Sequence, residues 1–130
     1  MNILKQLLDL ITINNDDCLI SESQLNEMAR VREIYSGIPY HIYVSTKLPV
    51  KGLHGPRIKV SNIKGTYSST DNFVVTISKD PVNKAGTPKC SDVQLEDIKD
   101  WVKLNYKQLM KYWNKEYKND DDFYAEIIKI

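Results

Sequence analysis

The sequence predicts an α+β fold in a single domain, 1–130, in which helices at both ends of the chain flank an antiparallel sheet. Apolar residues recur at helical spacing near both ends and alternate with polar residues in the middle. Clusters of Gly, Pro, Asn and Asp separate these periodic segments. We therefore expect two N-terminal helices, a three- to four-stranded antiparallel sheet, and a C-terminal helix or helix pair packed on one sheet face.

Two helices are expected before the sheet. The first spans 2–12, and the Asn and Asp residues at 14–17 end it because their side chains compete for backbone hydrogen bonds. The second spans 21–35, where Ser21 and Gln24 have the spacing of a capping box. The apolar stripe of the first helix consists of Ile3, Leu7, Leu10 and Ile11.

Three segments alternate with a period of two residues and are expected to be strands: 38–45, 57–61 and 72–78. Loops that contain proline and glycine, 47–56 and 79–89, adjoin them. One face of the sheet should be buried and the other, polar face should be solvated. The expected buried residues are Ile42, Val44, Ile58, Val60, Phe73, Val75 and Ile77.

The longest helical pattern begins at Ser91, which forms a second capping box with Gln94. Its apolar stripe is expected to cover the buried face of the sheet. The stripe consists of Leu95, Ile98, Trp101, Val102, Leu109, Tyr112 and Trp113. Asn105 interrupts this stripe, and a polar side chain that faces a core needs a partner or marks a helix boundary. We expect a bend or break within two residues of Asn105, and a last short helix after the Asn and Asp residues at 119–122.

A basic surface that contains aromatic residues is expected on the polar face of the sheet and its adjoining loop. Residues 47–94 contain eight basic and three acidic residues, which favours an anionic partner. An aromatic ring beside cationic side chains can stack on bases and neutralise phosphate, and it also suits a nucleotide or an acidic protein. The same pattern is typical of an ordinary solvated strand face entered through a Gly-Pro turn. The candidate binding residues here are His41, Tyr43, Lys51, His54, Arg57 and Lys59.

A ladder of lysines recurs every four residues along the C-terminal helix. It consists of Lys99, Lys103, Lys107, Lys111 and Lys115. No acid occurs between Trp101 and Lys115, so Lys103, Lys107 and Lys111 are further candidate binding residues. The ladder is interpreted either as a basic surface for phosphate or an acidic protein, or as the usual preference for lysine towards the end of a helix.

No catalytic residue, metal site or cofactor is assigned from the sequence. It contains no Walker loop, nucleophile-elbow or zinc-protease motif. His41 and His54 are its only histidines, and Cys18 and Cys90 lie too far apart for a paired-cysteine motif. Two free thiols are expected. A non-enzymatic protein is therefore favoured over an enzyme, although distant acids that meet in the fold leave catalysis open.

The segment IKDWVKLNYKQLMKYWNKEY, 98–117, resembles the C-terminal helical pattern of small uncharacterised proteins of bacteria and their phages. The stretch HGPRIKVSN, 54–62, resembles them as well. A composition rich in Lys, Ile and Asn fits an AT-rich genome. Small phage-type proteins without a catalytic motif are often binders that block or sequester a host component. The resemblance implies such a role and leaves the target open.

These observations favour a small non-enzymatic binding or inhibitor protein that acts on another macromolecule, of the kind that phages and mobile elements use against host or defence proteins. A protein partner is expected first. The alternative is nucleic-acid or nucleotide binding through the basic, aromatic-containing sheet face. The apolar runs are too short for a membrane span, and the opening residues carry charges that a signal peptide lacks. We therefore expect a cytoplasmic protein of a bacterium or an infected host cell, without a membrane partner.

Overall fold

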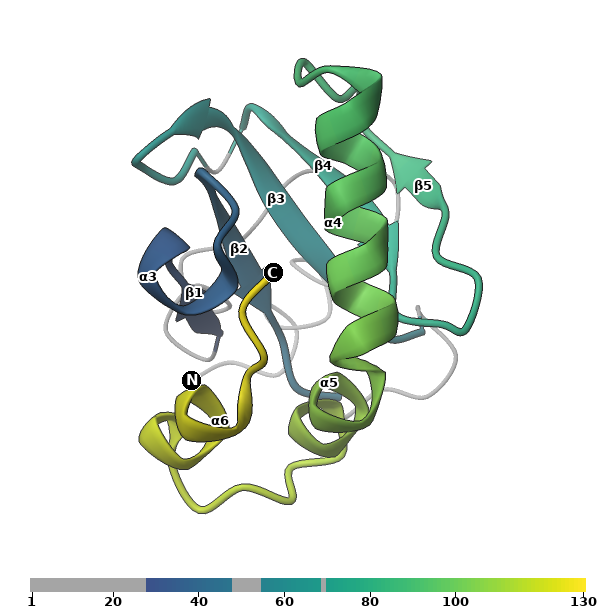
Figure 1. Cartoon of the computed structure of the whole chain (residues 1–130). Coiled ribbons are helices and arrows are strands. Elements are labelled where there is room, and N and C mark those ends of the chain that lie inside the picture. The colour runs from purple at the N-terminus through teal and green to yellow at the C-terminus, as the bar shows by residue number, and fades with distance from the viewer. Residues whose placement is uncertain (1–27, 48–54, 69) are drawn as a thin grey trace, which may run out of the picture.

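The computed structural model describes residues 28–47, 55–68 and 70–130 (Figure 1). In chain order they form β1 (Ala29–Val31), α3 (Glu33–Ser36), β2 (Tyr40–Val44), β3 (Arg57–Lys64), β4 (Asn72–Thr76), β5 (Asn83–Ala85), α4 (Asp92–Leu104), α5 (Tyr106–Trp113) and α6 (Asp120–Glu126). The predicted helix 2–12 and the part of the predicted helix 21–35 before residue 28 lie outside the described residues.

The described strands form one antiparallel sheet in the order β1-β2-β3-β4-β5. Ile42 pairs with Val60, and Val60 pairs with Phe73, so one row of apolar side chains crosses three strands. The α+β class and the antiparallel arrangement are thus confirmed. The predicted count of three to four strands is wrong, because the two short edge strands β1 and β5 add to the three that alternation revealed.

Strand β1 replaces the end of the predicted helix 21–35. Its residues pair with β2, with Ala29 opposite Val44 and Val31 opposite Ile42. Ala29 and Val31 are buried while Arg30 between them is exposed, which is the two-residue period of a strand. Three residues are too few for a period to be recognised against a helical pattern, and pairing with β2 decides the conformation. Only the turn α3 is helical here.

Strand β5 lies inside the predicted loop 79–89. Ala85 pairs with Val74 of β4, and the Asn83 side chain donates a hydrogen bond to the Val74 carbonyl at 3.0 Å. The sequence Asn-Lys-Ala has no alternation and gives no strand signal of its own. The segment is extended because the edge of β4 offers backbone donors and acceptors to it.

One face of the sheet packs against α4, as predicted. Figure 1 shows α4 crossing this face, with α5 and α6 below it. The seven residues expected on the buried face all belong to one core cluster with Ile98, Trp101 and Val102 of α4. The capping box of Ser91 and Gln94 is also present, with the Ser91 hydroxyl accepting from the Gln94 amide at 3.1 Å.

The opposite face of the sheet is buried as well, so the expectation of a solvated face is wrong. Tyr43, Arg57 and Lys59 on this face are 2–3% exposed. Ile58 is also fully buried, so the strand register is correct and both faces are covered. Met28 and Tyr67 pack on Tyr43 from outside the sheet. Alternation in the sequence identifies a polar and an apolar face of the sheet. It does not show that residues outside these strands pack over the polar face.

The helix break at Asn105 is confirmed, because α4 ends at Leu104 and α5 begins at Tyr106. The Asn105 side chain is fully buried, and each of its polar atoms has a partner. Its Nδ2 donates to the carbonyls of Trp101 at 3.1 Å and Ile128 at 3.0 Å. Its Oδ1 accepts from the Ile128 amide at 2.7 Å. Asn105 therefore joins the helix break to the C-terminal segment, and we call these three hydrogen bonds the Asn105 clamp.

The C-terminal segment 127–130 runs from α6 past the α4–α5 junction to α3 (Figure 1). Asn119 caps α6 by accepting a hydrogen bond from the Asp122 amide at 3.0 Å, in agreement with the predicted helix start. At the other end, the Ile130 amide donates to the Ser36 carbonyl at 2.9 Å. Gly37 next to it has φ +80°, and a Cβ there would lie 2.5 Å from the Ile130 carbonyl oxygen. Only glycine fits this approach.

Replacing Asn105 with alanine should destabilise the protein by about 2–4 kcal/mol, because the Ile128 amide and carbonyl lose their partners inside the fold. Urea denaturation measures the loss. Hydrogen exchange at the Ile128 amide should accelerate more than exchange in β3. Asn114→Ala is the matched control, since Asn114 is exposed at the end of α5. Equal stability of Asn105→Ala and wild type would contradict the role of the clamp.

Candidate functional site

The structure brings three predicted binding residues together on the face of the sheet opposite α4. Tyr43 on β2 pairs with Lys59 on β3, and Arg57 lies two residues before Lys59 on the same face. All three are buried, so they form a polar layer inside the protein. Their predicted binding role stays a prediction. Lys51 and His54 lie outside the described residues.

Tyr43 is held in place from the edge strand. Arg30 on β1 pairs with Tyr43 and donates a hydrogen bond from Nε to the Tyr43 hydroxyl at 2.6 Å. The Arg30 guanidinium also lies 5.4 Å from the centre of the Tyr43 ring. Burial raises the pKa of Tyr43, and the charge of Arg30 opposes this rise. Tyr43 remains a neutral phenol whose hydroxyl orients Arg30.

Arg30 and Arg32 are exposed cations that the sequence analysis did not select. The two-residue period along β1 places Arg30 on the strand side opposite Ala29 and Val31. Arg32 follows β1 as the N-cap of α3, with its guanidinium over the Tyr35 ring. Both arginines were missed because residues 21–35 were expected to be a helix. The signal that could have found them is the alternation Ala-Arg-Val-Arg at residues 29–32, directly before the turn α3.

His41 on β2 lies close to these arginines. The register that pairs Val31 with Ile42 brings Arg32 next to His41 across the two strands. The His41 imidazole is half-buried, and its Nδ1 atom is buried with no hydrogen-bond partner in the described structure. Burial lowers the pKa of His41, and the charges of Arg30 and then Arg32 lower it further. We call Arg30, Arg32 and His41 the β1–β2 cationic cluster.

The lysine ladder divides into structural and exposed members. Lys99 pairs with Glu96 at 3.5 Å, and the two residues lie three apart on the same helix. Lys111 pairs with Glu126 of α6 at 3.6 Å, and its Nζ lies 4.5 Å from the centre of the Tyr117 ring. Lys111 thus contributes to the packing of α6 against α5.

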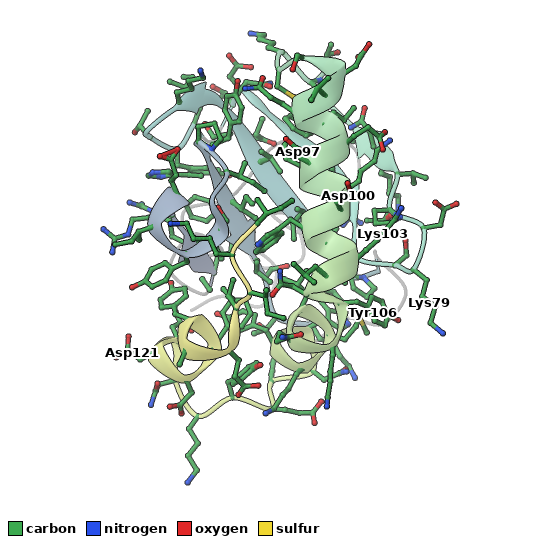
Figure 2. All side chains as sticks on the ribbon, viewed as in Figure 1. Lys79, Asp97, Asp100, Lys103, Tyr106 and Asp121 are labelled. Atoms are coloured by element: carbon green, nitrogen blue, oxygen red, sulfur yellow. The ribbon has the colours of Figure 1, made fainter. Side chains whose placement is uncertain are left out.

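Lys103 and Lys107 are exposed and form no ion pair with any part of the chain that the structure describes. Figure 2 shows Asp97, Asp100 and Lys103 following one another along α4 towards α5. The order of charge along this surface, acids first and lysines later, matches the helix macrodipole. Together with Lys115, which is exposed after the end of α5, Lys103 and Lys107 are the ladder members that are available to a partner.

Exposed aliphatic side chains surround the C-terminal segment. Ile34 of α3 is 67% exposed, and three more side chains are between 40% and 50% exposed, at Leu104, Ile128 and Ile130. The Asn105 clamp places Ile128 beside the end of α4, and the bond from Ile130 to Ser36 places Ile130 beside α3. These four residues therefore lie on three adjacent segments, and we call them the C-terminal strip.

No protein-family model, curated protein or solved structure matches the chain. Among the described residues, no group of three or more His, Cys, Asp or Glu side chains is placed to hold a metal ion. None of the described helices is both long enough and apolar enough to cross a membrane. Cys90 is a free thiol, as predicted, and burial raises its pKa; Cys18 lies outside the described residues.

Arg57→Glu should destabilise the protein by several kcal/mol, because it reverses a charge on a side chain that is buried within the sheet. Its urea midpoint should approach that of Ile58→Asp, which buries a charge on the other face. Lys84→Glu, at an exposed position of β5, should change stability by less than about 0.5 kcal/mol. A melting temperature of Arg57→Glu equal to that of wild type would show that this face opens readily to solvent.

The ionisation of the Tyr117 phenol should lower the stability of the folded protein in alkaline solution. Its hydroxyl donates to Glu126 Oε1 at 3.1 Å, and burial together with this carboxylate raises the pKa of Tyr117 from 10.0 to about 12. Between these values the unfolded chain loses the phenol proton and the folded chain keeps it, so this contribution is present below pH 10 and lost as pH rises towards 12.

Urea denaturation between pH 9 and pH 11 should therefore show a steeper loss of stability in wild type than in Tyr117→Phe, which has no proton to lose. Absorbance of the phenolate at alkaline pH provides the independent check. Parallel curves for the two proteins would contradict the raised pKa.

Proposed function

We propose that this protein is a small non-enzymatic binding or inhibitor protein that acts on another macromolecule, and that its partner is a protein. The single observation that carries this proposal is the C-terminal strip. Four exposed aliphatic side chains on adjacent segments are typical of a surface that another protein covers. The Asn105 side chain holds the backbone of Ile128, and the Ser36 carbonyl holds the Ile130 amide, while Ile34 and Leu104 lie on helices, so the surface is preorganised for association.

The charges next to the strip favour a partner with an acidic rim around an apolar centre. Lys103 directly precedes Leu104, Lys107 lies one turn further along the helical surface, and Lys129 lies between the two strip isoleucines. All three lysines are exposed. Rim charges of this kind steer association and select partners, while the apolar centre supplies most of the affinity.

The alternative, nucleic-acid or nucleotide binding, is supported by the exposed Lys103 and Lys107. The sheet face first considered for it carries Arg57 and Lys59 in buried positions, so nucleic acid would have to contact the helix surface instead. Phosphate contacts release counterions, and binding of this kind weakens steeply with salt.

The two candidates are separated by a pair of matched double variants. Ile34→Asp with Leu104→Asp places two charges in the strip and leaves the Asn105 clamp intact. Val82→Asp with Val93→Asp makes the same chemical change at exposed valines outside the strip. Immobilised protein is used to capture a partner from extracts of the natural host, with and without nuclease. The captured protein is then purified and its affinity measured by calorimetry.

The purified partner should bind wild type and the valine variant with similar Kd. It should bind the strip variant about a hundredfold more weakly, because the carboxylate of each new aspartate loses its hydration when the apolar centre of the interface is buried. Equal binding by both variants would contradict the strip as the interface. Capture that nuclease abolishes, with retention on heparin that falls steeply with salt and depends on Lys103 and Lys107, would establish the nucleic-acid alternative instead.

A further inference from the structure

We propose that the β1–β2 cationic cluster, Arg30, Arg32 and His41, binds a phosphate group carried as a phosphomonoester. Arg30 on the edge strand β1 and His41 on its neighbour β2 lie on the side of the sheet opposite α4, and Arg32 lies directly after β1, at the start of α3. This inference does not depend on the proposed function, since the cluster and the C-terminal strip share no residue.

The cluster concentrates positive charge without a matching acid. Neither Arg30 nor Arg32 forms an ion pair with any described residue. The contacts that they make are with aromatic rings: Arg30 with Tyr43, and Arg32 with Tyr35, whose ring centre lies 5.7 Å from the guanidinium carbon. Two neighbouring guanidinium groups repel each other, and the arrangement becomes favourable when an anion binds between them.

The aromatic contacts leave the guanidinium donors available. Arg30 uses Nε for the Tyr43 hydroxyl, which leaves its terminal NH₂ groups for a ligand. The aromatic contact of Arg32 uses none of its N–H groups as a hydrogen-bond donor to a described residue. Both side chains are exposed and can bind a tetrahedral oxyanion through two donors each.

His41 supplies a third donor at the inner side of the cluster. Its buried Nδ1 has no partner in the described structure, and its pKa is lowered by burial and by both arginines. A dianion placed among the three side chains compensates the two arginine charges and favours the protonated imidazole. A phosphomonoester matches this charge better than a carboxylate, because it brings about two negative charges and three acceptor oxygens.

The other charged residues around His41 are also compatible with a bound phosphomonoester dianion. The described elements next to β2 on this side are β1 and β3, with α3 following β1, and they carry mainly cations. Their charged residues are Arg30, Arg32, Arg57, Lys59, Lys64 and Glu33. Glu33 is the only acid among them. Helix α6, whose Tyr124 ring stacks on Tyr35 at 4.7 Å, carries four more acids, Asp120, Asp121, Asp122 and Glu126. None of these acids forms an ion pair with either arginine of the cluster.

The test is a titration of the purified full chain with inorganic phosphate, O-phosphoserine and AMP at constant ionic strength, followed by NMR of the His41 imidazole and by calorimetry. All three ligands should bind saturably at one site and raise the pKa of His41. Acetate at the same concentration should not. Tighter binding of O-phosphoserine or of AMP than of inorganic phosphate identifies which group attached to the phosphate is recognised.

Arg30→Gln and Arg32→Gln should each weaken phosphate binding about tenfold or more, since each removes charge-assisted hydrogen bonds. His41→Gln should still bind phosphate. In wild type the affinity should rise as the imidazole of His41 becomes protonated at low pH, and in His41→Gln this rise should be absent. Lys84→Gln, which removes an exposed cation from β5 at the other edge of the sheet, is the matched control and should bind like wild type. Absence of saturable binding at millimolar phosphate, or an equal loss in Lys84→Gln, would overturn the proposal.

Discussion

The arrangement of the helices depends on one buried asparagine. A polar side chain in an apolar core costs several kcal/mol unless its groups are paired, and Asn105 pairs them with the backbone of two distant segments. Its bonds end α4, turn the chain into α5, and hold the C-terminal segment against both. Tyr112 and Tyr117 then fix α6 through Asp120 and Glu126. Without Asn105 an uninterrupted helix would carry α5 away from β2, and the core around Leu109 and Phe123 would lose its cover.

The second constraint is that both faces of the sheet are buried. In a sheet with one solvated face, the polar residues of that face can contact a partner directly. In this protein Arg57, Lys59 and Tyr43 on that face are buried. Buried charges of this kind specify packing and are poor contact residues. The groups that can meet a partner therefore lie at the periphery. They are Arg30 on the edge strand β1 with Arg32 directly after it, the outer surface of α4 and α5, and the C-terminal segment 127–130.

Elements with a long or strongly periodic pattern could be predicted from the sequence, and short ones could not. The buried faces of β2, β3 and β4, the Ser91 capping box and the break at Asn105 all follow from local spacing. β1 and β5 have three residues each and are strands only because a neighbour pairs with them. The candidate site suffered from the same limit. Tyr43 and Lys59 were correctly predicted to lie side by side, but their burial depends on residues remote in sequence. Arg30 and Arg32 were not selected because a helix was predicted, wrongly, for the segment that contains them.

The bond between Ile130 and Ser36 has a consequence for how the chain folds during synthesis. The sheet and α4 are synthesised before Ile128 and Ile130, which supply the partners of Asn105 and Ser36. Closing so large a loop costs chain entropy that only the finished core repays. In the nascent protein Asn105 can bond to the Trp101 carbonyl, but it lacks its two bonds to the Ile128 backbone until that residue has been made, so the helical layer closes late in folding.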